Sequence, residues 1–357
     1  MQDKTISVKG QCKRPRYPPY SPIVKDYRPY TGRQLTQRPS ITENFEQNIH
    51  RDCWNLYYRN NTFNGFKDRN YILREFVELR EAIMASNSSD QAIINKNSKL
   101  HSCTGESRSV HNPKPFSWLE AGCGVGNAML PIFKEFGHLA HWRLLLGFDI
   151  SKVAINLLKD KKVSLPLPLQ EKLHVCVLNP CEERLSGCLF PTPLGDAGTF
   201  SSIGSSSSLY NPTVEFVSMI FVLSSIPVPL HASVLKRIAE CMVRPGGIFF
   251  FRDYARSDLA EKRFRSRKQG VSDTETERRN DVDGNLGGKN ESSIFARTNG
   301  TLSYFFSKEE LEKLFTSVGF SVIEIREVNR EVENRKAALC MSRKFIQGRF
   351  RLEKVDI

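Results

Sequence analysis

Long apolar runs are missing from this chain of 357 residues. A membrane-spanning helix needs about 18 or more apolar residues, and the longest candidates, 219–229 and 248–251, are much shorter. A secretory hydrophobic segment is missing too, so we expect no membrane partner. The composition, 39% hydrophobic and 25% charged, is that of a globular protein with a sizeable core.

Paired metal-binding cysteines are also missing. The nine cysteines are scattered, with no C-x-x-C pair and no His-x-x-x-His partner, which argues against a bound metal such as structural zinc. Cys123, Cys176 and Cys340 lie in apolar, strand-like runs, so we expect buried thiols rather than disulfides. This pattern favours a reducing compartment. We expect a cytoplasmic protein, with an organelle matrix or the nucleus as alternatives.

Acidic residues are outnumbered by basic ones. Lys and Arg number 52 against 39 Asp and Glu, which gives a net charge of +13. Such an excess fits a polyanionic partner through counterion release, and it fits a solvated basic surface equally well. The basic residues gather in four segments: 1–40, 67–74, 252–268 and 343–351.

The chain divides into three parts. Residues 1–41 are rich in Lys, Arg, Pro and Tyr and predict an extended basic arm, a composition that can grip single-stranded nucleic acid. Residues 42–112 predict a helical region that ends in a Ser/Asn-rich loop. Residues 113–357 alternate strand and helix patterns, and two polar inserts, 187–212 and 265–293, predict loops within them.

The most informative segment begins as a buried strand that ends on Glu120. It then turns into a helix through three glycines: Gly122, Gly124 and Gly126. This spacing lets backbone approach a ligand where any Cβ would clash, and the helix start presents free N–H groups there. A dinucleotide fingerprint would place its third glycine at Asn127. A carboxylate two residues before the first glycine instead favours S-adenosylmethionine, which carries positive charge and no phosphate.

A second strand pattern, 143–149, ends on Asp149. A strand-end acid about 20 residues beyond the glycines can bind both hydroxyls of a ribose. The alternative is an N-cap for the helix predicted at 151–159, a role that Ser151 can fill equally well. We favour ribose binding, because both acids then end neighbouring strands and face one site.

Alternating strands and helices predict a parallel α/β sheet. Its strands are expected at 117–120, 144–149, 173–178, 215–223, 247–252, 321–328 and 336–341. Ser307 and Glu310 have the spacing of a capping box, which predicts the start of a helix over 308–318. Gly319 is placed to end that helix.

With these residues placed, the chain resembles the transfer RNA N3-methylcytidine methyltransferases. The resemblance spans most of 45–352 and is carried by W-N-L-Y-Y (54–58), F-K-D-R (66–69), L-R-E-F (73–76), L-E-A-G-C-G-V-G-N (119–127), I-F-V-L-S (220–224), F-R-D-Y (251–254), G-T-L-S-Y-F-F (300–306) and L-C-M-S-R (339–343). It implies a seven-stranded, Rossmann-like class I methyltransferase sheet with a helical N-terminal extension. It also implies methyl transfer from S-adenosylmethionine to cytidine 32 of the anticodon loop.

The resemblance implies roles for individual cofactor-binding residues. Trp54 and Tyr58 would close over the cofactor, Gly126 would lie in its loop, Asp149 would bind the ribose, and Ile220 would line the pocket. The i, i+4 spacing places the two aromatic rings on one helix face. Without the resemblance, that pair would be interpreted as an ordinary core stripe.

Three positions depart from the family pattern: Glu215 stands where the family tends to have Asp, Pro227 where it tends to have His, and Val177 matters most. The family usually has an acid that binds the adenine amino group, and this chain has Val177 there. We expect Leu178 to stack against the adenine ring and Asn179 or a backbone carbonyl to accept from the amino group. We expect the loss of the acid to cost about 1 kcal/mol if such an acceptor compensates for it, and more if none does.

Cytosine N3 carries a lone pair and is largely unprotonated near neutral pH, so methylation there needs alignment more than a general base. In the F-R-D-Y segment, Asp253 is expected to orient the base and balance the product cation. Tyr254 is expected to stack on it, and Arg252 to contact phosphate. A local Arg252–Asp253 salt bridge is the alternative.

Lys67, Arg69 and Arg74 are assigned to substrate phosphates, against the alternative of a solvated helix face. N3 is occupied in a Watson–Crick pair, so the target must be unpaired or flipped out. Some family members need a partner such as an aminoacyl-tRNA synthetase. Two other functions stay open from the sequence: methylation of a protein or small molecule, and a catalytically weak RNA-binding subunit.

Overall fold

The computed structural model describes residues 46–85, 113–185, 189, 213–268, 294–297, 299–334 and 339–353. The predicted arm, 1–41, lies outside these ranges, as do nearly all of the insert 187–212 and the Ser/Asn-rich loop from residue 86 onward. The insert 265–293 was expected to be a loop throughout, but its first four residues complete helix α11 (Leu259–Lys268). The rest of that insert is also outside the described ranges.

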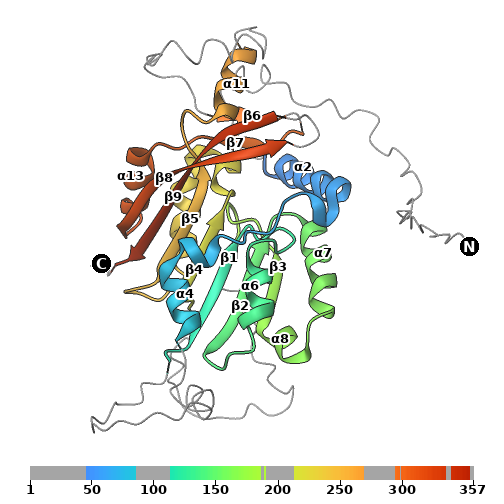
Figure 1. The fold of residues 1–357 in the computed structure, drawn as a ribbon, viewed down its shortest axis with the longest axis vertical. Helices are drawn as coiled ribbons and strands as arrows, with labels where there is room; N and C mark the ends of the chain where they lie inside the picture. Colours follow the sequence, from blue (N-terminus) through green and yellow to red (C-terminus); the bar gives the residue numbers. More distant parts are fainter. Residues whose placement is uncertain are drawn as a thin grey trace, which may run out of the picture.

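The centre of the protein is a seven-stranded sheet in the order β3-β2-β1-β4-β5-β9-β8 (Figure 1). The strands are β1 (Phe116–Ala121), β2 (Trp142–Asp149), β3 (Leu173–Val177), β4 (Phe216–Ile220), β5 (Ile248–Tyr254), β8 (Phe320–Asn334) and β9 (Leu339–Leu352). The first five are parallel, and β9 runs antiparallel to both β5 and β8. The strand order reverses between β1 and β4, and such a switch point opens a ligand crevice at the carboxyl edge. The predicted fold class is confirmed.

Helices flank the sheet and cover part of its carboxyl edge. The N-terminal extension forms α2 (Glu46–Asn61), η1 (Thr62–Asn64), α3 (Ile72–Glu75) and α4 (Val77–Met84). The sheet domain adds α6 (Met129–Phe136), α7 (Lys152–Val163), α8 (Leu167–Lys172), η3 (Leu223–Ser225), η4 (Val228–Leu230), α10 (His231–Ala239), α11 and α13 (Lys308–Thr316), with a small hairpin of β6 (Ile294–Ala296) and β7 (Leu302–Tyr304). Ser307 and Glu310 form the predicted capping box at α13.

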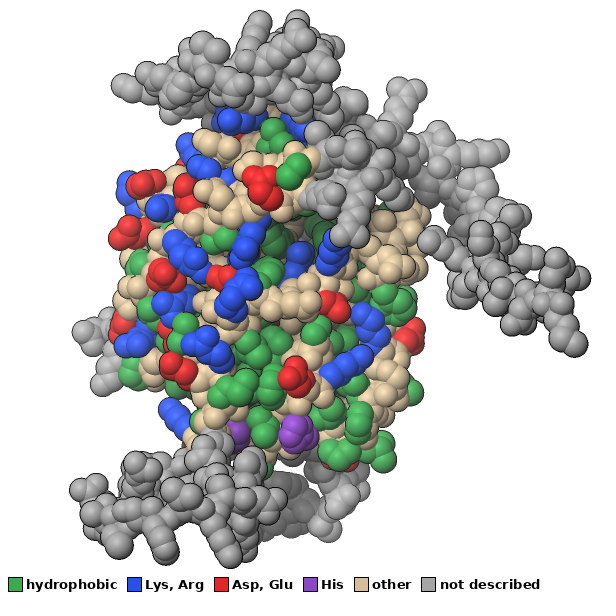
Figure 2. Space-filling view, in the orientation of Figure 1, with side chains coloured by type: hydrophobic (Ala, Val, Ile, Leu, Met, Phe, Trp, Pro, Cys, Tyr) green, Lys and Arg blue, Asp and Glu red, His purple; other side chains and the backbone are tan. Residues whose placement is uncertain are grey.

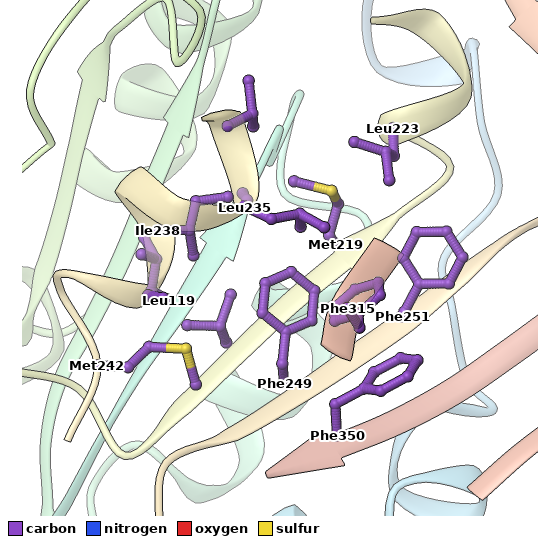
Figure 3. Packing of buried hydrophobic residues seen from close by; sticks show 14 of the residues in the cluster. Leu119, Met219, Leu223, Leu235, Ile238, Met242, Phe249, Phe251, Phe315 and Phe350 are labelled. Atoms are coloured by element: carbon purple, nitrogen blue, oxygen red, sulfur yellow. The ribbon is translucent and has the colours of Figure 1, made fainter. Parts of the chain in front are cut away.

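Two apolar layers sandwich the sheet, because successive strand residues face opposite sides. One layer packs Leu119, Phe249 and Phe251 against α10 and α13 (Figure 3), and it includes a parallel stack of Phe315 on Phe350 at 3.7 Å between ring centres. The other layer contains Trp118 and Phe250, with Phe76 of the N-terminal extension stacked on Phe250 at 4.7 Å. The extension is therefore an integral part of the fold.

The C-terminal hairpin is longer than predicted. Strand β9 was expected at 336–341 and reaches Leu352, and β8 was expected to end at Val328 and continues to Asn334. Residues 343–351 form a strand whose apolar residues Ile346 and Phe350 are buried. The many basic residues between them make this strand hard to recognise in the sequence. Arg349 reaches Glu78 (2.8 Å) and Glu324 (3.2 Å), so its charge is matched on that face.

None of the helices in the described ranges is long and apolar enough to cross a membrane. Within the same ranges, no three or more His, Cys, Asp or Glu side chains gather as a metal site would require.

Candidate active site

The glycine turn after β1 is a cradle that only glycine can form. Gly122, Gly124 and Gly126 all have positive φ angles, of 69°, 52° and 84°, a region that side chains disfavour. A Cβ at Gly122 would lie 2.5 Å from Val222, and one at Gly124 would run into the Tyr58 hydroxyl. The backbone can therefore approach a ligand closely at this turn.

Asp149, at the end of β2, braces the same turn. Its carboxylate accepts from the backbone N–H of Gly124 (2.9 Å) and of Ser151 (2.8 Å). The N-cap of α7 is Ser151, whose hydroxyl accepts from the N–H of Ala154 (3.1 Å). Ser151, and not Asp149, is therefore the N-cap of α7. Burial raises the pKa of Asp149 to about 6, against the opposing effect of the two hydrogen bonds, and its remaining lone pairs can accept from ribose hydroxyls.

Helix α2 forms a wall over this turn. The rings of Trp54 and Tyr58 lie 6.1 Å apart and face the same pocket, as the i, i+4 spacing predicts. On the same helix, Asn55 accepts from the Ser151 hydroxyl (2.9 Å) and the Val153 N–H (3.2 Å). These bonds fix α2 to the start of α7 and hold the two rings in place.

Glu120 is the most unusual group in the site. It is 3% exposed, and its Oε2 has no hydrogen-bond partner among the described residues. Burial raises its pKa to about 8, although the positive charge of Arg69 opposes the shift. A buried acceptor without a partner is costly unless a ligand supplies one. A cationic ligand group next to Glu120 would satisfy this need.

Arg69 lies beside Glu120 at the edge of the pocket. Its backbone N–H donates to the carbonyl of Asn127 (2.9 Å), which ties the N-terminal extension to the glycine turn. Its guanidinium lies 5.0 Å from the ring centre of Phe221 and 5.7 Å from that of Phe66. We expected Arg69 to contact substrate phosphate, but this position also suits a ligand carboxylate.

These groups surround one pocket with about 1070 Å³ of empty space, counting the part open to solvent. Eight predicted site residues line it: Trp54, Tyr58, Arg69, Glu120, Gly122, Gly124, Asp149 and Ile220. The glycine cradle, the unpartnered acid and the strand-end acid together fit S-adenosylmethionine. Seven predicted site residues do not line the pocket: Lys67, Arg74, Gly126, Leu178, Arg252, Asp253 and Tyr254.

Leu178 and Gly126 serve packing instead. Leu178 is fully buried in the core, so the expectation that it stacks on adenine is wrong. The backbone N–H of Leu178 donates to the carbonyl of Asp149 (3.0 Å). The next residue, Asn179, lines the pocket. A Cβ at Gly126 would meet Leu130 at 2.7 Å, so this glycine lets the turn pack against the helices.

Asp253 was expected to face the reacting centre and lies behind the pocket wall. It is fully buried, and its carboxylate accepts from the backbone N–H of Ser224 (2.9 Å) and of Tyr254 (2.9 Å). Burial raises its pKa to about 6. The contact with Ser224 holds η3, whose last residue, Ser225, lines the pocket, as does Val222 just before it. Asp253 therefore positions the wall and does not contact the cofactor pocket itself.

Arg252 points to the opposite face of β5, since successive strand residues alternate. It donates to the side-chain oxygen of Gln347 (2.9 Å) and stacks on Tyr71 at 4.3 Å, in place of the expected phosphate contact or pairing with Asp253. It is 2% exposed. The ring centre of Tyr254 lies 5.1 Å from that of Phe221. Phe221 lines the pocket, and Tyr254 packs behind it.

Lys67 and Arg74 lie on the exposed surface of the N-terminal extension. Arg74 pairs with Glu75 at 2.9 Å, and its side chain is 62% exposed. Both remain available to a large ligand outside the pocket.

Sequence reasoning missed several pocket residues, and His50 and Phe221 are the most informative of them. His50 lies one helical turn before Trp54, a spacing that could have identified it. Phe221 follows Ile220 and has a φ of 59°, which is rare for a bulky residue and is a recurrent feature of functional sites. Its conformation is fixed by its N–H, which donates to the carbonyl of Arg252 (2.7 Å). Nothing in the sequence signals that strain.

Comparison with known proteins places this site in a family. The family described as "Methyltransferase domain" matches residues 91–325. The tRNA N(3)-cytidine methyltransferase METTL6 of Homo sapiens is 30% identical over 298 residues, covering 83% of this chain and 78% of that protein. METTL6 of Rattus norvegicus is 29% identical over 304 residues, covering 85% and 79%. The tRNA N(3)-methylcytidine methyltransferase trm141 of Schizosaccharomyces pombe is 28% identical over 296 residues, covering 83% and 89%.

The matched family model, residues 91–325, includes the glycine turn and both strand-end acids, so the family and the geometry agree. The protein is an enzyme whose cofactor is S-adenosylmethionine. The chain belongs to the tRNA N(3)-cytidine methyltransferases, a family of class I methyltransferases.

Proposed function

We propose that this protein methylates N3 of cytidine in transfer RNA and that its target is cytidine 32 of the anticodon loop. The observation that carries the proposal is the pocket at the β1/β4 switch point, with its glycine cradle and unpartnered Glu120. The names of the relatives supply the substrate, and the resemblance described above supplies the position.

The pocket residues suggest how the cofactor is held. S-adenosylmethionine supplies an electrophilic methyl group on a positively charged sulfur. We assign its ribose to Asp149 and its α-ammonium to Glu120, because these are the two acids in the pocket lining. Arg69 is the cation of the lining and is assigned to the α-carboxylate, in a charge-assisted pair. Trp54 and Tyr58 exclude water from above.

The described residues suggest that catalysis rests on alignment. Cytosine N3 needs no proton removed before it attacks, so the reaction needs no general base. Both acids of the lining, Glu120 and Asp149, are assigned to the cofactor. Phe221 is held rigidly at the pocket wall, where its ring face can stabilise the positive charge that develops on the base. Asp253 contributes by fixing the η3 turn.

The substrate must present an unpaired cytosine, as an anticodon loop does. Figure 2 shows Lys and Arg side chains spread over the face of the molecule, interspersed with acidic ones. Lys67 and Arg74 are exposed on the same N-terminal extension as the pocket-lining Arg69 and are assigned to phosphates of the bound RNA. Contacts of this kind position RNA without reading its sequence.

Primer extension on transfer RNA treated with the protein tests the position. A methyl group at N3 blocks Watson–Crick pairing, so reverse transcriptase should stop next to position 32 only after treatment. The matched control is Asp149→Ala, which should leave no stop. A stop at another cytidine would refute the position, and methylation of guanosine would refute the chemistry.

A catalytically weak RNA-binding subunit is the second candidate, because Val177 stands where the family usually has an acid. Calorimetric titration with S-adenosylmethionine separates the two. Saturable binding at micromolar ligand supports the enzyme, whereas a folded protein with no detectable heat at millimolar ligand supports the weak subunit.

A further inference from the structure

The far end of the pocket is an apolar slot. Beyond Asp149 the lining continues with Ile150, Asn179, Pro180, Cys181, Ile226, Pro227 and Leu230. If the ribose lies at Asp149, a flat ring attached to it enters this slot. Apolar walls suit the faces of adenine, but its 6-amino group still needs an acceptor, because burying an N–H without a partner costs free energy.

The end of β3 offers little for that amino group. Val177 pairs in register with Asp149, and its aliphatic side chain cannot accept a hydrogen bond. The side-chain oxygen of Asn179 already accepts from the N–H of Cys181 (3.1 Å). Since this oxygen already holds one donor, an acceptor from another element would strengthen the recognition of the adenine amino group.

Helix α2 brings a candidate to the same pocket. His50 lines the pocket, and its Nδ1 is buried with no hydrogen-bond partner in the described part of the chain. It precedes Tyr58 by eight residues, which is roughly 12 Å along a helix. Tyr58 sits over Gly124 and Asn55 bonds the start of α7, so the helix leads from the glycine turn past the ribose position, toward the adenine slot.

We propose that Nδ1 of His50 accepts a hydrogen bond from the 6-amino group of the cofactor's adenine and so replaces the acid that Val177 has displaced. The inference rests on the cofactor assignment and does not depend on the RNA target. It gives a role to a buried polar atom that otherwise lacks one.

The protonation state of the ring agrees with an acceptor. Burial lowers the pKa of His50 to about 4, so the imidazole is neutral at physiological pH. A neutral imidazole has one N–H and one lone pair. With the proton on Nε2, the lone pair lies on Nδ1, the buried ring atom that has no partner among the described residues.

The test compares two ligands by calorimetry: S-adenosylhomocysteine and its analogue with hydrogen in place of the 6-amino group. The wild-type protein should bind the amino compound about threefold to tenfold more tightly, the range expected for one hydrogen bond. His50→Leu should bind both compounds equally, with the analogue's affinity within about twofold of the wild-type value. His50→Gln, which keeps an acceptor, should retain part of the preference.

Arg51→Leu is the matched control, because Arg51 is exposed on the same helix and does not line the pocket. It should leave both affinities unchanged, and thermal melting should show that every variant is folded. The inference is overturned if His50→Leu keeps the wild-type preference or weakens both ligands equally. A wild-type protein that binds neither compound would overturn the cofactor assignment as well.

Discussion

Replacement of Glu120 by Gln tests the electrostatics of the site most sharply. Burial raises the pKa of this carboxyl to about 8 from an ordinary value of 4.5. The folded apoprotein therefore keeps a proton that the unfolded chain releases above pH 4.5. The unfolded state then binds fewer protons, so the free energy of unfolding must fall as pH rises toward 8.

The size of the effect follows from the shift. One pKa unit corresponds to about 1.4 kcal/mol, so Glu120 should lower the stability of the apoprotein by about 2 kcal/mol between pH 6 and pH 8. Asp149 and Asp253, with pKa values near 6, titrate mostly below pH 7. Glu120→Gln should therefore remove most of the slope above pH 7.

Binding should show the opposite trend. A cationic cofactor favours the ionised carboxylate, so the affinity of the wild-type protein for S-adenosylmethionine should rise by about tenfold per pH unit below pH 8. Glu120→Gln should lack this rise. Urea denaturation measures the stability and calorimetry measures the affinity, both in half-unit steps from about pH 6.5 to about pH 8. Identical pH profiles for the variant and the wild type would refute the reasoning.

Three further substitutions test the geometry. Gly124→Ala should weaken cofactor binding at least about tenfold, because a side chain at this positive φ meets the Tyr58 hydroxyl; unchanged affinity in calorimetry would contradict the cradle. Asp253→Ala should lower the midpoint of thermal unfolding through a loss of about 1–3 kcal/mol, since it leaves the Ser224 N–H unpaired, and Asp253→Asn should lose less; equal stability of all three proteins would count against this role. Val177→Asp should strengthen cofactor binding about threefold to tenfold by adding an acceptor at the end of β3, and a weaker complex would disprove it.

Much of the fold could be predicted from the sequence because its signals are local. The buried runs that end on Glu120 and Asp149 mark two parallel strands, and the glycines between them require a sharp turn. The capping box at Ser307 is equally local and is confirmed. These features depend on neighbours within a few residues of each other.

The errors concern the direction of side chains and long-range pairing. Leu178 and Asn179 are adjacent, and the turn at the end of β3 decides which of them faces the pocket. The carboxylate of Asp253 accepts a hydrogen bond from Ser224, 29 residues away in the sequence. No local sequence pattern indicates this contact. The extension of β9 to Leu352 was missed because Arg349 is matched by Glu78 and Glu324, which lie far away in the sequence.

The most direct test of the central claim is nucleoside mass spectrometry of total transfer RNA after incubation with the purified protein and S-adenosylmethionine. We predict the appearance of 3-methylcytidine with the wild-type protein and its loss with Asp149→Ala. A folded, cofactor-binding protein that forms no 3-methylcytidine, or that methylates a different base, would contradict the account.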